Sequence, residues 1–252
     1  MFSAVRCSIL VLGLAFVPPM AALAGARHFT YIYEATTSAP GSVETENWAT
    51  WSRTSDGGRS NSFDFRHELE FGITRRLQAS IYLADWSYLD ERGRSGFRYS
   101  DTAVEVIYNL TNPILDPVGI SIYQELRAGD RLCELESKFI AQKNIGRWIL
   151  AYNATVEAVW DGKDWGERKG EIQNSLGVSY QVSTRFSVGL EFLHQFVLPQ
   201  WNDHEKIRNV FVGPNVAYRR GSWFVTVTGL AQASSTPDEP EIQLRTIFGT
   251  SL

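Results

Sequence analysis

The chain has few cysteines, few histidines and no excess of basic residues. It contains 2 cysteines and 4 histidines, and its formal net charge at pH 7 is −4. This mild acidity gives no support for nucleic-acid binding, which a strongly basic surface would favour. Nucleic acid is therefore not expected among the partners of this protein.

Long apolar runs are also missing, with one exception near the start. Arg6 is followed by an uncharged run over residues 7–17, and small residues follow that run. A basic start, a short apolar run and an A-x-A-like end predict a secretory signal peptide, with cleavage after Ala24 or Ala26. The run is too short for a transmembrane helix, which needs about 20 apolar residues. We therefore expect an exported protein from which residues 1–26 have been removed.

Export would leave Cys133 as the single cysteine, since Cys7 goes with the signal. No intramolecular disulfide is then possible, so the fold needs another source of stability. The aromatic content is 13%, with 8 tryptophans, which is typical of a chain with membrane interfaces.

Alternation with period two is what the chain has in abundance. Between Ser62 and Ile73, for example, apolar residues alternate with aspartate, arginine and glutamate. A strand separates such residues onto two faces, whereas a helix scatters them around its circumference. The same alternation occurs in twelve segments: 43–53, 62–73, 77–87, 100–110, 118–127, 131–143, 148–160, 171–182, 186–198, 208–218, 223–233 and 241–252.

The lengths of these segments and of their connectors favour a membrane barrel. A membrane-spanning strand needs about 9–11 residues, whereas strands of soluble proteins are most often about 5–6 residues long. Outer-membrane barrels have short periplasmic turns and longer external loops. The connectors alternate in this way, short at 74–76, 144–147, 183–185 and 219–222, and long at 54–61, 88–99, 161–170, 199–207 and 234–240.

We therefore predict an all-β fold, a single-chain, up-and-down antiparallel transmembrane β-barrel of about 12 strands, formed by residues 42–252. Closure is expected because an open sheet would leave unpaired backbone groups in hydrocarbon. Residues 27–41 fall outside the twelve segments. We interpret them as an N-terminal periplasmic arm, and a segment that enters the lumen is the alternative.

Charged residues gather on the polar faces of the predicted strands. These faces carry eleven acids and four bases, whereas Asp85 is the one charge that falls on an apolar face away from a strand end. Acids that line a pore select cations; the alternative is that acids and bases pair and fill a narrow barrel. The lumen-facing candidates are Arg66, Glu68, Glu105, Glu125, Glu134, Glu136, Lys138, Glu157, Glu191 and Arg245.

Signs of enzymatic or metal chemistry are weak. An outer-membrane phospholipase carries a histidine and a serine two positions apart on one strand face, so that the imidazole takes the hydroxyl proton. None of the four histidines is followed by serine at that spacing. The acids of residues 161–167 and 202–205 lack the spacing of a calcium loop. We expect no enzyme activity, no cofactor and no metal site.

Four short phrases resemble a known family. They are Tyr31–Glu34, Ser38–Glu44, Glu68–Arg75 and Gly213–Asn215. They are similar to sequences of an uncharacterised proteobacterial outer-membrane β-barrel family that carries a domain-of-unknown-function label. That family is similar in layout to channels encoded beside phenol-degradation pathways. The resemblance implies the fold and the bacterial outer membrane as location, and no established activity.

The function predicted from the sequence is a porin-like passive channel for small solutes with a weakly cation-preferring lumen. A closed structural or ligand-binding barrel is the alternative, and an outer-membrane lipid hydrolase comes third. The expected partners are outer-membrane lipid and lipopolysaccharide, the barrel-assembly machinery and a possible small-molecule solute.

Overall fold

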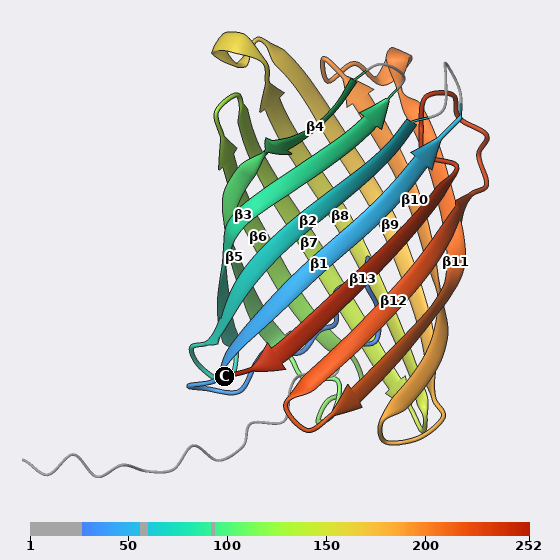
Figure 1. Cartoon of the computed structure of the whole chain (residues 1–252). Helices are drawn as coiled ribbons and strands as arrows, with labels where there is room; N and C mark the ends of the chain where they lie inside the picture. Colours follow the sequence, from blue (N-terminus) through green and yellow to red (C-terminus); the bar gives the residue numbers. More distant parts are fainter. Residues whose placement is uncertain (1–26, 56–59, 92–93) are drawn as a thin grey trace, which may run out of the picture.

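The strands of this protein form one sheet that closes on itself. The computed structural model describes residues 27–55, 60–91 and 94–252, and the predicted signal peptide lies outside these residues. Strand β1 (Val43–Thr54) pairs antiparallel with β2 (Ser60–Gly72) on one side and with β13 (Ile242–Ser251) on the other. The sheet is therefore a barrel with tilted strands, as Figure 1 shows.

The remaining strands follow one another around the wall, each antiparallel to its neighbours. Among residues 27–55, 60–91 and 94–252, no helix is long and apolar enough to cross a membrane. The short helices η1 (Lys163–Trp165) and η2 (Asp203–Glu205) lie in connectors. The other strands are β3 (Leu77–Glu91), β4 (Arg94–Tyr99), β5 (Asp101–Thr111), β6 (Gly119–Gly129), β7 (Leu132–Ile145), β8 (Trp148–Asp161), β9 (Glu167–Gln181), β10 (Phe186–Pro199), β11 (Ile207–Arg220) and β12 (Trp223–Gln232).

β4 continues β5 instead of adding a thirteenth strand to the wall. β3 pairs with β5 up to Tyr82↔Ala103 and with β4 from Trp86↔Tyr99 onward, and both pairs belong to one register. The wall therefore has the twelve strands that were predicted. The prediction of a long connector at 88–99 is wrong, because most of these residues form the hairpin between β3 and β4. Alternating aromatic residues stabilise that hairpin, with the rings of Tyr88 and Phe97 4.8 Å apart.

The two ends of the barrel differ. At one end of the barrel the start of β1 lies beside the end of β13, where the backbone N–H of Leu252 donates to the carbonyl of Val43 over 2.9 Å. Short turns such as 146–147 and 221–222 lie at this end, which we name the turn end. The longer connectors lie at the opposite end, which we name the loop end. An even number of antiparallel strands requires this arrangement of the two chain ends.

The outward face of the barrel is apolar and carries aromatic residues near both ends. Apolar side chains such as Val106, Phe139 and Leu190 are 43–56% exposed on the outside of the wall. Near the turn end the rings of Trp148 and Tyr180 are 4.8 Å apart. Near the loop end the rings Trp86–Tyr99 and Trp160–Trp201 form similar pairs. An apolar band between two aromatic girdles matches a bilayer and its interfaces, so the barrel is an outer-membrane barrel.

One β-bulge corrects the assignment of Asp85 to the apolar face. His67 of β2 pairs with Ala84 of β3, but the next residue, Glu68, pairs with Tyr82, so Leu83 is an extra residue. An extra residue reverses the alternation beyond it. Tyr82 and Asp85 therefore both point inward, at 0% and 9% exposure, while Leu83 is 57% exposed.

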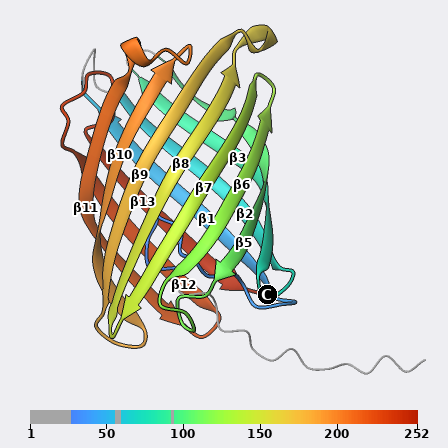
Figure 2. The same ribbon diagram turned by 180° about the vertical axis from the view of Figure 1, so that it is seen from behind.

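The segment from Arg27 to Thr37 lies inside the barrel. It is drawn as a dark blue coil near the turn end (Figures 1 and 2). Phe29, Ile32 and Ala35 are 0% exposed. The structure thus places this segment in the lumen, where the sequence had favoured a periplasmic arm. We call residues 27–37 the lumen segment.

Candidate functional site

Side chains of the barrel wall bind the backbone of the lumen segment. The backbone N–H groups of Thr30 and Tyr31 donate to the two carboxylate oxygens of Glu191 over 2.9 and 2.8 Å. Asn153 accepts from the N–H of Tyr33 at 2.7 Å and donates to its carbonyl at 2.9 Å. These contacts join residues more than 100 positions apart. They occupy inward-facing side chains and leave the hydrogen bonds between the strands intact.

Apolar residues hold the same segment against one wall. Phe29 and Ile32 pack in a buried cluster with residues of β8 and β10–β12, among them Ile149 and Leu193. Gly177 of β9 makes room for the ring, because a Cβ atom there would lie 2.6 Å from Cε1 of Phe29. The wall is therefore shaped to the lumen segment, and the segment fills the lumen near the turn end.

A cavity of about 480 Å³ lies between the lumen segment and the loop end. We call it the vestibule. Thr30, Tyr31 and Tyr33 form its floor, and its upper lining includes Ser87 and Gln243, near the loop-side ends of their strands. A smaller cavity of about 100 Å³ lies on the other side of the segment. Because Tyr33 contacts both cavities, the lumen segment separates them.

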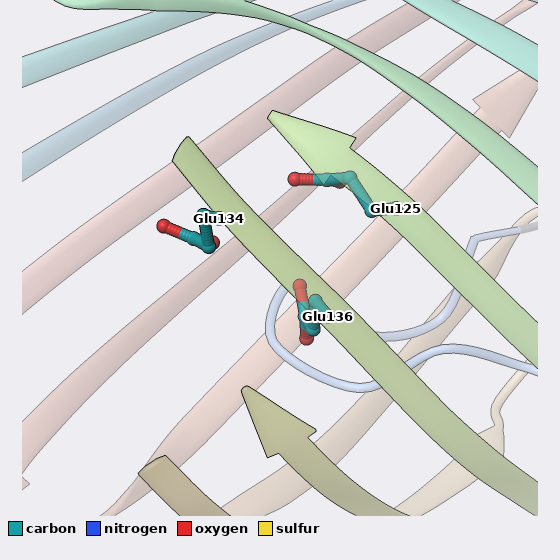
Figure 3. Close-up of side chains that lie close together, drawn as sticks. All are labelled: Glu125, Glu134 and Glu136. Atoms are coloured by element: carbon teal, nitrogen blue, oxygen red, sulfur yellow. The ribbon is translucent and has the colours of Figure 1, made fainter. Parts of the chain in front are cut away.

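On one side of the vestibule a single arginine lies among several acids. The guanidinium group of Arg127 lies 3.1–3.5 Å from carboxylate oxygens of four acids. Figure 3 shows two of these, Glu125 of β6 and Glu134 of the adjacent β7, beside Glu136. The four acids are Asp85, Asp101, Glu125 and Glu134.

Cationic side chains also cover the tyrosines of the lumen segment. The ammonium group of Lys138 contacts Glu136 and lies 4.6 Å from the ring centroid of Tyr33. The guanidinium group of Arg245 lies 3.8 Å from the ring centroid of Tyr31. Such stacking is attractive because the ring faces carry negative charge. The segment is thus bound by hydrogen bonds, apolar packing and cations together.

All ten residues predicted to face the lumen lie on the inward side of the wall. Three of them have separate contacts, and the other seven belong to the vestibule. Glu191 binds the lumen segment, and Glu105 accepts from Tyr82 and Tyr33. Glu68 is 3% exposed on β2, close to Glu105 and Arg27. The remaining seven line the vestibule or touch its charges: Arg66, Glu125, Glu134, Glu136, Lys138, Glu157 and Arg245.

Several residues of this lining were missing from the candidates. Asp101 and Glu171 stand at strand ends, where an alternating pattern assigns faces poorly, and Asp85 follows the bulge. Arg127 was on a predicted polar face but was not selected. The tyrosines of the lumen segment were not among the candidates, because their contacts are with distant strands.

The histidines give no support to a hydrolase. His28 pairs with Glu34 at 2.8 Å, His67 with Asn47 and His194 with Arg208. Within the described residues, no histidine ring is hydrogen-bonded to a hydroxyl or a thiol. An activated nucleophile of the serine–histidine type requires that contact.

Comparison with known sequences places the chain in a family. A model described as a family of unknown function, DUF6662, matches residues 21–241. The chain belongs to that family. No curated protein sequence matches this DUF6662 barrel.

Solved structures share its fold at low sequence identity. The COG4313 outer membrane channel from Pseudomonas putida F1 aligns with a TM-score of 0.68 at 11% identity, over 89% of this chain and 100% of that one. The NanC porin aligns with a TM-score of 0.56 at 11% identity, over 82% and 100%. The translocator domain of the autotransporter NalP from Neisseria meningitidis gives 0.51 at 9% identity, over 83% and 87%. The DUF6662 barrel therefore has the fold of outer-membrane channels and porins.

Proposed function

We propose that this protein is a porin-like outer-membrane channel for small polar solutes, with a weak preference for cations. The observation that carries the proposal is the polar lining of the lumen, with cavities of about 480 Å³ and 100 Å³ on either side of the lumen segment. A structural barrel has no need of charged cavities, since apolar filler of the same volume is often as stable as buried ion pairs.

The cation preference rests on the count and placement of charges. Arg127 is shared among four acids. Glu157 has no hydrogen bond or ion pair within the described residues, although it lines the vestibule. An excess of carboxylates gives the lumen a negative potential, which raises the local concentration of cations and does so most at low salt.

Passage through this channel requires the lumen segment to move. The segment is bound by side chains, so its release breaks none of the strand pairs that hold the barrel. Local rearrangements of this kind occur in microseconds to seconds. We expect a channel that is mostly closed and opens for short periods.

Planar-bilayer recording tests the proposal directly. The refolded protein should give brief openings, and reversal potentials in a salt gradient should indicate cation preference. The double variant Glu134→Gln, Glu136→Gln should lower that preference, because it removes two carboxylates from the vestibule lining. An anion-selective or unselective pore contradicts the electrostatic part of the proposal.

A closed ligand-binding barrel is the second candidate, and the tight fit of the lumen segment favours it. The two candidates differ in one measurement. A channel conducts more when the segment is loosened by Glu191→Ala, whereas a closed barrel stays silent in both forms.

A further inference from the structure

Five glutamates form a row across adjacent strands of the wall. In the sheet register Glu105 of β5 stands opposite Glu125 of β6, and Glu125 stands opposite Glu136 of β7. Glu136 in turn stands opposite Glu157 of β8, and Glu157 opposite Glu171 of β9. Like charges that face each other directly on a sheet are destabilising. Stability of the fold therefore does not account for this row.

The two ends of the row differ in how their charge is compensated. At one end Glu105 and Glu125 are 1% exposed and bind tyrosine hydroxyls. At the other end Glu136, Glu157 and Glu171 line the vestibule. Glu136 has the ammonium group of Lys138 and Glu171 has the amide of Gln195. Between them, Glu157 has neither a hydrogen bond nor an ion pair within the described residues, and the cation that attracts it from the adjacent strand, Lys169, does so without direct contact.

A hydroxyl beside this part of the row points to a ligand. Thr155 stands two residues before Glu157 on the inward face of β8, lines the vestibule and is 4% exposed. Its Oγ1 atom has no hydrogen-bond partner within the described residues. A buried hydroxyl without a partner costs free energy, and a ligand N–H group in the vestibule would satisfy it.

The spacing of the carboxylates favours an extended cation over a single metal ion. Neighbouring strands lie about 4.8 Å apart, so consecutive glutamates of the row present negative charge at steps of that size. Among the described residues, one set of three acids is close enough to share a metal ion: Glu125, Glu134 and Glu136. Arg127 and Lys138 already contact that set. Glu157 and Glu171 lie outside it.

We infer that the vestibule binds a linear aliphatic diamine or polyamine along Glu136, Glu157 and Glu171. One ammonium group lies at Glu157 and donates to Thr155, and the next lies one strand away, at Glu171. The methylene chain between the ammonium groups spans the distance between the two neighbouring strands. This inference rests on the proposed channel function and names its solute class.

Calorimetric titration of the refolded full-length barrel with 1,4-diaminobutane at low salt tests the inference. The diamine should bind about tenfold more tightly than n-butylamine, because it forms a second charge pair in a partly desolvated site. Glu157→Gln should weaken diamine binding about tenfold. Glu205→Gln removes the same charge from the exposed helix η2 and should leave binding unchanged.

Thr155→Val provides a second variant of almost the same shape, and it should weaken diamine binding without changing the net charge. Equal affinity for diamine and monoamine, or unchanged binding in both vestibule variants, overturns the inference. Tighter binding of Mg²⁺ than of the diamine also overturns it. Conductance is recorded separately without amine. Conductance without diamine binding overturns this inference alone, whereas diamine binding without conductance overturns the channel proposal alone.

Discussion

The two halves of the lumen are built in opposite ways. In the half near the turn end, the lumen segment fills the space, and Glu191 receives four hydrogen bonds, from Thr30, Tyr31, Asn215 and Thr228. In the half near the loop end, Glu157 stands in a cavity with no such partner. Both residues are inward-facing glutamates of the same wall. The comparison indicates that one half is filled by the lumen segment, whereas the other leaves acidic side chains facing a cavity.

The difference also shows how a barrel can hold a segment in its lumen without loss of strand pairing. The strands keep the backbone hydrogen bonds between them, and the lumen segment binds to side chains that already point inward. The free energy of closure is then separate from the free energy of folding. Substitutions in the two halves should therefore change different measurements.

The largest difference is expected from the paired substitutions Glu191→Ala and Glu157→Ala. Loss of Glu191 removes the two hydrogen bonds that its carboxylate accepts from the backbone N–H groups of Thr30 and Tyr31, and a hydrogen bond to a carboxylate contributes about 1.5–3 kcal/mol. The lumen segment should be released, and open probability in planar bilayers should rise at least tenfold (~1.4 kcal/mol). Loss of Glu157 should leave open probability unchanged. An equal rise in both variants would show that the two halves do not differ as described.

A smaller effect on open probability is expected from a larger side chain in the part of the wall that contacts the lumen segment. Gly177→Val places atoms where the Phe29 ring lies, since even a Cβ there would be 2.6 Å from the ring. Overpacking of this kind typically costs about 1–3 kcal/mol, and here it falls on the contact with the segment. Openings should become more frequent. Gly170→Val on the same strand is the control, because its Cβ meets neighbours at 3.4 Å or more; if it opened the channel equally, strand damage would be the cause.

A double-mutant cycle on Arg27 and Glu46 measures the charged contact at the start of the segment. The two groups are 2.7 Å apart and almost buried, and the guanidinium also lies 4.6 Å from the ring centroid of Trp48. Arg27→Gln alone should favour opening by a few-fold, because it leaves a buried carboxylate with one partner fewer. The coupling with Glu46→Gln should be about 1 kcal/mol, within the range for contacting residues. Additive effects would show that the pair does not hold the segment.

The smallest effect concerns pH and His28. Burial, the largest single effect, lowers the pKa of His28, but the charge of the Glu34 carboxylate and its hydrogen bond to the ring together raise it, so that the net pKa lies above the ordinary 6.5. Arg219 acts in the opposite direction, and Gln181 contacts the ring at 3.3 Å. A raised pKa means that the stabilisation is complete below pH 6.5 and is lost as the pH rises through the folded-state value.

Openings should therefore become more frequent as the pH rises through the raised pKa of His28. His28→Gln should flatten this dependence, and single-channel recording from pH 6 to 9 measures it. An unchanged pH profile in the variant would assign the effect to other groups of the lumen.

Local sequence determined most of the wall. Period-two alternation placed all twelve strands and the inward side of all ten candidate residues, because each side chain of a strand lies on the face opposite to its neighbour. The apolar outward face and the two aromatic girdles followed from the same pattern. These features are local, so that a single strand contains the information for its own faces.

Tertiary structure decided what is inside the wall. Thr30 and Glu191 are 161 residues apart in the chain, and no local pattern shows that one will bind the other. The row of five glutamates depends on the register between strands, which the sequence of each strand does not specify. Asp85 turned inward because of a bulge that only the pairing of β2 and β3 shows. The sequence thus determined a membrane barrel with acidic inner faces, and long-range contacts decided that residues 27–37 enter its lumen, because their backbone groups bind inward-facing side chains of distant strands.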